Sequence, residues 1–307
     1  MANCIRCGRQ LPGLTFGKKI CQWCVQHEAA QRGEVADDAP QVVMPTPWVR
    51  PEVSLGVTQI ILGINVAVFL GMALSGSTIM EFPIAESIHW GANVGALTFS
   101  GEWWRLLTCV FVHGGIIHIA FNMWCLWNLG ALCESLYGRW TYIAIYLICG
   151  LGASLASAAF HPYTPSVGAS GAIFGLAGAL IAAFKLGEFS VPRSALSGTL
   201  RSLGAFVVYN LIFGAIIPGI DNTAHIGGLV TGLIVGALVA LIAPQQDQAP
   251  RRAAIFVVVI VTLAGGAIGA AHHYRIPLRF GRVDYERSAN LPENNPVSSL
   301  VASPRPF

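Results

Sequence analysis

The sequence has few charged residues: they make up 11% of its 307 residues, against 54% hydrophobic ones. A water-exposed surface needs about twice that share of charge, so a soluble globular protein is excluded. The net charge of +3 is spread along the chain rather than gathered in a basic patch, and we expect no nucleic-acid partner. The first fifty residues are too polar for a cleavable signal peptide, so we expect the mature chain to begin here. This composition predicts an all-α polytopic membrane protein.

Seven apolar runs, each close to the ~20 residues that a helix needs to cross a bilayer, predict seven transmembrane helices. The runs are residues 55–74, 114–132, 142–160, 168–184, 203–220, 224–243 and 253–271. The segment 75–113 is too mixed to span, and its tryptophans favour a structured loop lying partly among the headgroups. Residues 272–307 are polar and contain prolines, so we expect a disordered tail.

A cysteine-rich segment precedes the first apolar run. Cys4 and Cys7, and then Cys21 and Cys24, form two pairs with two residues between the thiols of each pair. Four thiolates in this pattern bind one zinc ion tetrahedrally, so residues 1–27 are predicted to be a zinc-ribbon-like module with structural zinc. A pair of disulfides is the alternative if this end of the chain faces an oxidising compartment. A redox motif is the alternative if the segment belongs to a thioredoxin-like domain. The composition of residues 28–54 predicts a linker.

The positive residues indicate the orientation of the chain. With seven spans and a cytoplasmic N-terminus, twelve of the 18 lysine and arginine residues lie on the inner side and six on the outer side. Positive charge is enriched in cytoplasmic loops, so this orientation is favoured. It also places the four N-terminal cysteines in a reducing compartment, where thiols remain free to bind metal. We expect a multi-pass protein of the cell (plasma) membrane with its N-terminus in the cytoplasm.

Four polar side chains within the apolar runs are candidate site residues: His118, Asn122, Ser170 and His225. Polar groups in hydrocarbon are costly and usually functional. Because successive spans alternate in direction, all four are predicted at a similar depth, a little below the outer surface. His118 and Asn122 are four residues apart and therefore share one helix face.

Glycine spacing predicts that Ser170 and His225 meet. Glycines four apart follow both residues, Gly171 and Gly175 after Ser170, and Gly228, Gly232 and Gly236 after His225. Such rows let two helix backbones approach closely, although a serine framed by glycines is by itself more often a packing residue. The histidines and asparagine elsewhere in the spans favour function, and we predict a nucleophile, Ser170, with His225 as its general base and acid.

The start of the helix at Ser170 predicts an oxyanion hole, because free backbone N–H groups and the helix dipole favour negative charge there. The Ser170 N–H and the side chains of His118 and Asn122 are its predicted donors. The elbow of soluble hydrolases, G-x-S-x-G, is absent because Ala172 replaces its last glycine. Asp221 is a possible third member of a triad, but its position is more typical of a helix N-cap, so a dyad is predicted.

These motifs resemble those of the rhomboid family of intramembrane serine proteases. The matching segments, in order, are Trp104-Arg105, His113, residues 118–122 (HIAFN), residues 168–171 (GASG) and residues 224–228 (AHIGG) followed by Gly232. The resemblance covers about residues 55–243. It implies a six-helix rhomboid core, to which residues 253–271 add one extra C-terminal transmembrane helix.

The resemblance also implies a function. Ser170 and His225 would be the catalytic dyad, with His118, Asn122 and the Ser170 amide as the oxyanion hole. The expected substrates are single-pass or other membrane proteins, cut in or near a transmembrane helix within the lipid bilayer, with no cofactor in catalysis. Phe174 stands where many members carry a tyrosine that stacks on the histidine.

Two other classes of membrane protein are alternatives. A catalytically silent rhomboid-like binder or chaperone is the first alternative, but such relatives lose the serine or the histidine, and this chain has both. A transporter is the second, but paired carboxylates, an inverted repeat and interrupted helices are missing from the sequence.

Overall fold

The computed structural model describes residues 4–7, 20, 24, 25, 28, 56–75, 78–187, 193–244 and 248–273. The chain divides into two compact units, Met1–Val53 and Ser54–Phe307. The predicted linker, 28–54, lies outside the described residues except for Glu28, and the predicted tail, 272–307, lies outside them except for His272 and His273. In the described part of the second unit, all regular elements are helices, with one isolated antiparallel bridge between Asn93 and Ser166.

Among the described residues, six helices are long and apolar enough to cross a membrane. They are α2 (Val57–Leu74), α6 (Ile116–Tyr137), α7 (Arg139–Phe160), α9 (Arg193–Ile216), α10 (Asn222–Ile242) and α11 (Ala249–His273). A seventh apolar helix, α8 (Ser170–Leu186), has 17 residues. All seven predicted runs are therefore helical, and most of their predicted ends are a few residues from the observed ones.

Two predicted boundaries were wrong by more than that. Helix α9 begins at Arg193 rather than at Leu203, because its first turns are helical but too polar to register as part of an apolar run. Helix α6 continues to Tyr137 rather than ending at Leu132, past the polar residues Glu134 and Ser135. A hydropathy pattern marks the apolar part of a helix and not its hydrogen-bonded ends.

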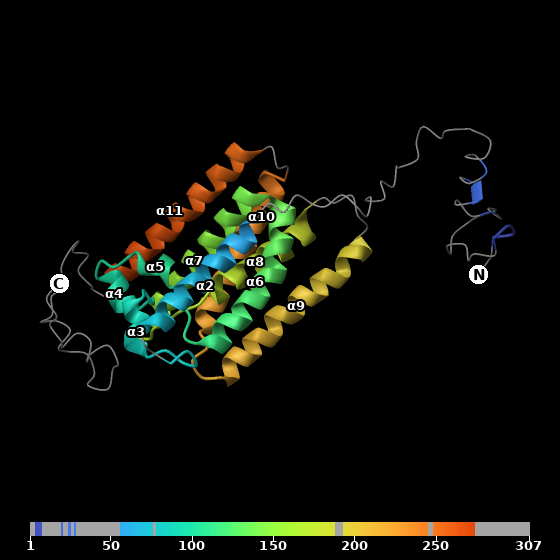
Figure 1. The fold of residues 1–307 in the computed structure, drawn as a ribbon. Coiled ribbons are helices and arrows are strands. Elements are labelled where there is room, and N and C mark those ends of the chain that lie inside the picture. The colour runs from blue at the N-terminus through green and yellow to red at the C-terminus, as the bar shows by residue number, and fades with distance from the viewer. Residues whose placement is uncertain are drawn as a thin grey trace, which may run out of the picture. The chain divides into compact units, whose positions relative to one another are not determined.

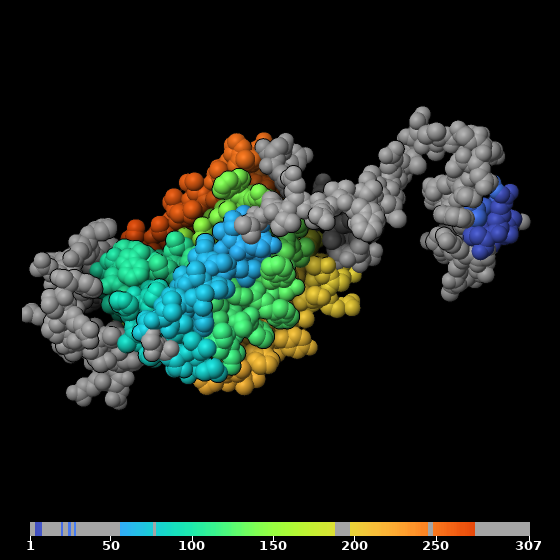
Figure 2. All heavy atoms as spheres, in the orientation of Figure 1, coloured from blue at the N-terminus to red at the C-terminus, as the bar shows by residue number. Residues whose placement is uncertain are grey.

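Helix α8 is the centre of the bundle. It contacts α6, α7, α9 and α10, and every residue from Gly171 to Leu180 is buried. Figure 1 shows α9 and α11 at opposite edges of this bundle. Figure 2 shows the face on which α2 and α6 lie side by side. A short helix suffices at the centre because protein, not lipid, surrounds it.

A single glycine joins α6 to α7. Gly138 has a φ of +78°, in the left-handed region that side chains other than glycine rarely adopt. Its N–H donates to the carbonyl of Glu134 at 3.0 Å, which closes the last turn of α6. The chain then reverses direction within one residue, so α6 and α7 lie antiparallel.

Glu134 explains why α6 extends beyond the apolar run. Its carboxylate accepts hydrogen bonds from the backbone N–H groups of Val57 and Thr58, at 2.8 and 3.0 Å, and from the Thr58 hydroxyl at 2.8 Å. The N-cap of α2 is Gly56, which offers no side-chain acceptor. Glu134 therefore caps α2 from a neighbouring helix, satisfying N–H groups that would otherwise lack partners.

The long connection between α2 and α6 is structured, as predicted. It contains three short helices, α3 (Ile84–His89), α4 (Gly95–Phe99) and α5 (Arg105–Thr108). The buried Arg105 holds them together: its guanidinium donates to the carbonyls of Ile88 and Ala92, at 2.7 and 2.9 Å, and pairs with Glu102 at 2.5 Å.

A second buried arginine fixes α11 to the bundle. The guanidinium of Arg252 donates to the carbonyls of Ala243, Tyr137 and Pro244, at 3.0, 3.1 and 3.1 Å, and to the Thr141 hydroxyl at 3.1 Å. These acceptors lie at the C-terminal ends of α10 and α6 and in the first turn of α7. A cation at helix C-termini satisfies carbonyls that lack helical partners and complements the dipole.

We expect Arg252→Ala to lower the free energy of unfolding by about 3 kcal/mol, because several hydrogen bonds from a charged group are lost together. The measurement is thermal unfolding in detergent. Arg251→Ala is the matched control, since Arg251 is the neighbouring residue and is exposed. Equal unfolding temperatures for the two variants would contradict a fixing role for Arg252.

Candidate active site

Ser170 and His225 are in hydrogen-bonding contact. Ser170 is the first residue of α8, and His225 lies in the first turn of α10. The Nε2 atom of His225 is 2.9 Å from the Oγ atom of Ser170, and the imidazole is buried. The first turns of two adjacent helices therefore bring a hydroxyl and an imidazole together from positions 55 residues apart in the chain.

Glycine contacts between α8 and α10 produce this approach. A Cβ atom built on Gly228 would lie 1.9 Å from the carbonyl oxygen of Gly171, and one on Gly232 would lie 1.9 Å from that of Gly175. Any side chain at these positions would overlap the neighbouring backbone. The prediction that the glycine rows draw these two helices together is confirmed.

An aromatic ring fixes the plane of the imidazole. Phe174 stacks on His225 with ring centroids 4.2 Å apart and an interplanar angle of 8°, and Phe206 of α9 packs behind Phe174 at 5.4 Å. The phenyl ring thus lies against the histidine where the resemblance placed an aromatic ring.

Asp221 caps α10 and, among the described residues, makes no hydrogen bond to the imidazole. Its Oδ1 atom accepts a hydrogen bond from the Ala224 N–H at 2.9 Å, which confirms the predicted N-cap. The Nδ1 atom of His225 is buried and has no hydrogen-bond partner among the described residues. The geometry is therefore that of a pair and not of a hydrogen-bonded triad.

His118 and Asn122 lie beside the backbone that leads into Ser170. Gly168 has a φ of +113°, and a Cβ atom built on it would lie 2.6 Å from Nε2 of His118 and 3.4 Å from Nδ2 of Asn122. Its N–H donates to the carbonyl of Cys109 at 2.9 Å, which anchors this turn to the end of α5. The structure thus brings all four candidate side chains to one place.

The hydrogen bonds of His118 determine which of its ring nitrogens is a donor. The Gly114 N–H donates to Nδ1 of His118 at 3.4 Å, so Nδ1 is an acceptor and the proton of the neutral ring is on Nε2. Nε2 is the nitrogen that lies against Gly168.

Burial, with a further contribution from the neighbouring His118, lowers the pKa of His113 to about 3. His113 packs edge-on against His118, at 5.2 Å, as a neutral ring.

Asn122 is a predicted oxyanion donor, so replacing it with alanine is expected to lower kcat by about 100-fold to 1,000-fold with little change in KM. Asn128→Ala is the matched control: Asn128 is exposed on the same helix and, like Asn122, donates to the carbonyl four residues earlier. Steady-state cleavage kinetics measure both variants. Similar kcat values would show that Asn122 has no role in stabilising the oxyanion.

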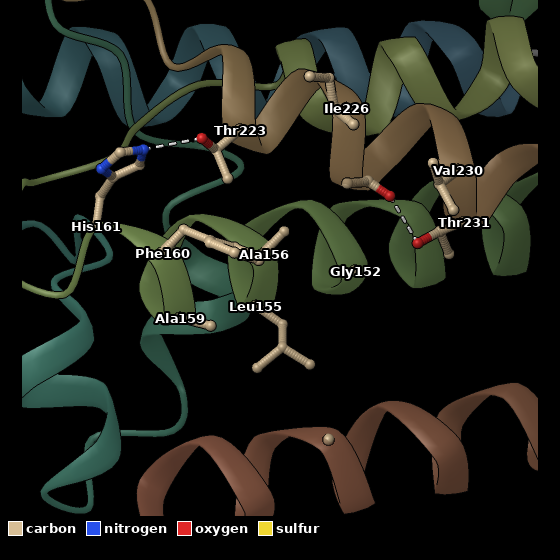
Figure 3. Close-up of a pocket in the computed structure, with 12 residues that line it drawn as sticks. Gly152, Leu155, Ala156, Ala159, Phe160, His161, Thr223, Ile226, Val230 and Thr231 are labelled. Atoms are coloured by element: carbon tan, nitrogen blue, oxygen red, sulfur yellow. Dashed lines mark hydrogen bonds between the residues drawn. The ribbon is translucent and has the colours of Figure 1, made fainter. Parts of the chain in front are cut away.

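A separate hollow lies between α7 and α10 (Figure 3), and Gly266 of α11 is also among its lining residues. Its volume is about 670 Å³, and its lining is mostly apolar. At one end Nε2 of His161 is 2.9 Å from the Thr223 hydroxyl. Ser170 and His225 are not among its lining residues, so this hollow is not the candidate site.

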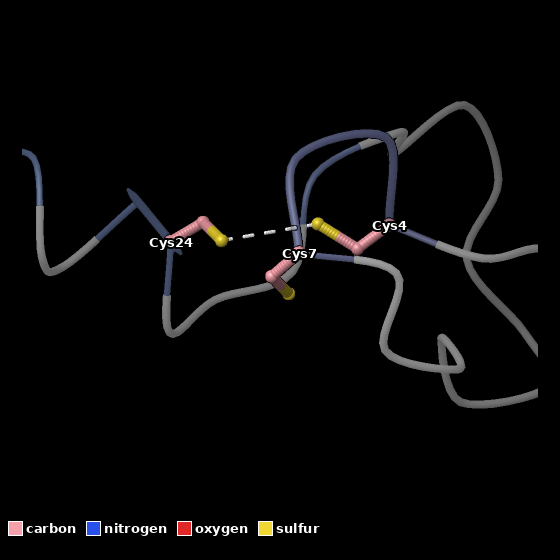
Figure 4. Close-up of side chains that lie close together, drawn as sticks. All are labelled: Cys4, Cys7 and Cys24. Atoms are coloured by element: carbon pink, nitrogen blue, oxygen red, sulfur yellow. Dashed lines mark hydrogen bonds between the residues drawn. The ribbon is translucent and has the colours of Figure 1, made fainter.

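The first unit contains a cluster of cysteines (Figure 4). The sulfur atoms of Cys4, Cys7 and Cys24 lie within 4.8 Å of one another, and the Cys4 and Cys24 sulfurs are 3.9 Å apart. Thiolates bound to one tetrahedral zinc at ~2.3 Å are about 3.8 Å apart, so this donor set fits zinc. Cys21, the fourth predicted ligand, lies outside the described residues.

Three polar residues around the site were not singled out by the sequence: Asn93, Ser157 and Ser166. Asn93 and Ser166 form the β-bridge, and the hydroxyls of both serines donate to Asp221. Serines and asparagines are common in loops and at helix ends, and nothing in their spacing distinguishes these three.

Membrane-length helices around a partly buried serine–histidine contact define a class, the polytopic membrane proteins with a serine-hydrolase-like pair. A family model described as "Rhomboid domain" matches residues 100–242. The chain is 31% identical over 210 residues to rhomboid protease AarA of Providencia stuartii, covering 62% of this chain and 74% of that protein. It is 37% identical over 214 residues to rhomboid protease GluP of Bacillus subtilis (strain 168), covering 68% of this chain and 39% of that protein.

A plant relative matches over a shorter region. RHOMBOID-like protein 6, mitochondrial, of Arabidopsis thaliana is 41% identical over 145 residues, or 47% of this chain and 46% of that protein. The chain thus spans less than half the length of GluP and of this plant protein. The match to the family model and the identity to AarA and GluP show that the chain belongs to the rhomboid family. With its apolar helices, it is an integral membrane protein.

Proposed function

We propose that this protein is an intramembrane serine endopeptidase that cleaves transmembrane segments of other membrane proteins. The observation that carries the proposal is the 2.9 Å contact between Nε2 of His225 and Oγ of Ser170. A nucleophile within hydrogen-bonding reach of its base is the geometric requirement for nucleophilic catalysis. The names of AarA and GluP, both rhomboid proteases, support the same reaction class.

The proposed reaction has two halves. His225 takes the Ser170 proton as Oγ bonds to the scissile carbonyl carbon, and it then gives that proton to the leaving amine as the C–N bond breaks. Water next attacks the acyl ester as His225 takes its proton, and His225 gives this proton to Oγ as the ester C–O bond breaks, which releases the new carboxyl group and restores the Ser170 hydroxyl. During both attacks the carbonyl oxygen carries negative charge, which the Ser170 N–H, Nε2–H of His118 and Nδ2–H of Asn122 stabilise.

The experiment that tests this function is cleavage in proteoliposomes. The full chain is reconstituted with single-pass reporter proteins that differ in their transmembrane sequences, and the products are identified by mass spectrometry. We expect at least one reporter to be cut within or next to its span by the wild-type protein and not by Ser170→Ala. Cleavage of equal rate and position by both proteins would refute the proposal.

The second candidate is a catalytically silent binder of membrane proteins. Among the described residues Nδ1 of His225 has no hydrogen-bond partner, and this favours the silent binder because soluble serine hydrolases orient that nitrogen with an acid. Co-purification of intact reporters with the reconstituted protein, without products at any substrate concentration, would select this alternative.

We further propose that α11 crosses the membrane as a seventh span and that the N-terminus lies in the cytoplasm of a cell whose plasma membrane holds the protein. The support is the length and composition of α11 and the excess of positive residues on the predicted inner side. Seven crossings place the two termini on opposite sides. Protease accessibility of tags at each end of the chain in sealed vesicles tests this, and two tags cut from the same side would contradict it.

We propose that Cys4, Cys7, Cys21 and Cys24 hold one structural zinc ion, and that zinc takes no part in cleavage. The clustered sulfurs of three of these residues support the site. Metal analysis of the full chain is expected to find about one zinc per chain, and Cys24→Ser is expected to lose most of it, because three ligands bind zinc far less tightly than four. Cys125→Ser is the control, since this cysteine is buried among the spans. Equal zinc content in the two variants would rule out the proposed ligands.

A further inference from the structure

The carboxylate of Asp221 joins three segments of the chain. Besides the Ala224 N–H on Oδ1, its Oδ2 atom accepts hydrogen bonds from the Ser157 hydroxyl at 2.5 Å and the Ser166 hydroxyl at 2.7 Å. Ser157 lies near the end of α7 and Ser166 in the connection between α7 and α8. Both serines are buried and Asp221 is half-buried, so these hydrogen bonds are partly shielded from water.

Ser166 and Asp221, which are joined by a hydrogen bond, each lie four residues before one member of the Ser170–His225 pair. Ser166 precedes Ser170 by four residues, and Asp221 precedes His225 by four residues and accepts the His225 N–H on its carbonyl at 3.1 Å. The bond between Ser166 and Asp221 therefore joins the two backbones just before they deliver the hydroxyl and the imidazole. The bridge of Ser166 with Asn93, at 3.0 and 2.8 Å, ties the same point to the long connection.

We propose that Asp221 is a positioning residue that holds Ser170 and His225 at reacting distance by joining the segment before α8 to the start of α10. This inference rests on the proposed protease function. Asp221 acts through Ser166 and through the first turn of α10, and among the described residues its carboxylate makes no hydrogen bond to the imidazole or to the Ser170 hydroxyl. Its role is geometric: both oxygens are occupied by three donors, while Nδ1 of His225 has no partner among the described residues.

A geometric role of Asp221 and a role of its negative charge predict different effects of replacing it with asparagine. Asparagine keeps an amide oxygen for the Ala224 N–H, and its NH₂ group can donate to the two serine hydroxyls, which rotate to accept. The connection is preserved while the negative charge is lost. Alanine removes both.

The test compares Asp221→Ala, Asp221→Asn, Ser166→Ala and Ser157→Ala in the full chain, with kcat expressed per active site titrated by a fluorophosphonate. Asp221→Ala is expected to lower kcat by about 100-fold with KM unchanged, since a misplacement of about 1 Å costs this much. Asp221→Asn is expected to recover to within about 10-fold of the wild type. Ser157→Ala is the matched control, because Ser157 bonds to the same oxygen of Asp221 but lies on α7, which carries neither Ser170 nor His225. Ser166→Ala is expected to lower kcat more than Ser157→Ala does.

Three results would overturn the inference. They are a wild-type kcat in Asp221→Ala, an Asp221→Asn variant as slow as Asp221→Ala, and a larger loss in Ser157→Ala than in Ser166→Ala. Misfolding is separated from slow chemistry because the titration is carried to its end point, so that folded sites that label slowly are also counted. Failure of the proposed function itself is distinguishable, because the wild-type protein would then show no cleavage dependent on Ser170.

Discussion

Replacing Ser170 with alanine, or His225 with alanine, is expected to lower kcat/KM for a transmembrane reporter by about 10⁴-fold or more, and the double variant is expected to be no slower than either one. Residues that act as one unit in catalysis have strongly non-additive effects. Without the hydroxyl no acyl ester forms, and without the imidazole nothing accepts its proton at 2.9 Å. Steady-state cleavage in proteoliposomes measures all three variants.

Ser135→Ala and His89→Ala are the controls for this series, because they remove a serine and a histidine that are exposed and lie outside the site. Both are expected to retain wild-type rates. Independent effects, in which the double variant loses the product of the two single losses, would show that Ser170 and His225 do not work as a pair.

Gly228→Val is expected to lower the free energy of unfolding by about 3 kcal/mol and to reduce kcat by about 100-fold in the protein that still folds. A Cβ atom at Gly228 would lie 1.9 Å from the Gly171 carbonyl oxygen, so α8 and α10 must separate by about 1.5 Å to restore normal contact. Gly171 directly follows Ser170, so this separation lengthens the contact between Ser170 and His225. Thermal unfolding and cleavage kinetics measure the two effects.

Gly265→Val is the matched control for the glycine contact. Gly265 is on α11, and a Cβ atom built on it meets no atom within 4 Å. The same substitution there is expected to change the free energy of unfolding by less than about 1 kcal/mol, the scale of helix propensity. If the two variants were equally stable and equally active, close packing of α8 on α10 would not be what holds the site together.

The sequence predicted the approach of Ser170 to His225 because glycine spacing acts through backbone geometry, which a residue pattern records directly. Glycines four apart on both helices leave few ways to pack them, and the contacts of Gly228 and Gly232 follow. Likewise the position of Asp221, just before a predicted helix, was sufficient to predict an N-cap.

Other features depend on partners that no local pattern identifies. Arg252 and Glu134 are single polar residues near the ends of apolar runs. The donors to Glu134 and two of the four acceptors of Arg252 belong to helices more than 70 residues away. Arg252 was counted in the sequence only as a positive charge, and Glu134 lay beyond a predicted helix end. Their roles follow from tertiary structure, because backbone groups at helix ends accept any suitably charged side chain that reaches them.

The most direct test of the account is covalent labelling of the detergent-solubilised protein with a fluorophosphonate, which reacts only with an activated serine. The account predicts rapid labelling of the wild-type protein at Ser170, none of Ser170→Ala, and a loss of at least about 100-fold in rate for His225→Ala. Equal labelling of all three proteins would contradict the claim that His225 activates Ser170.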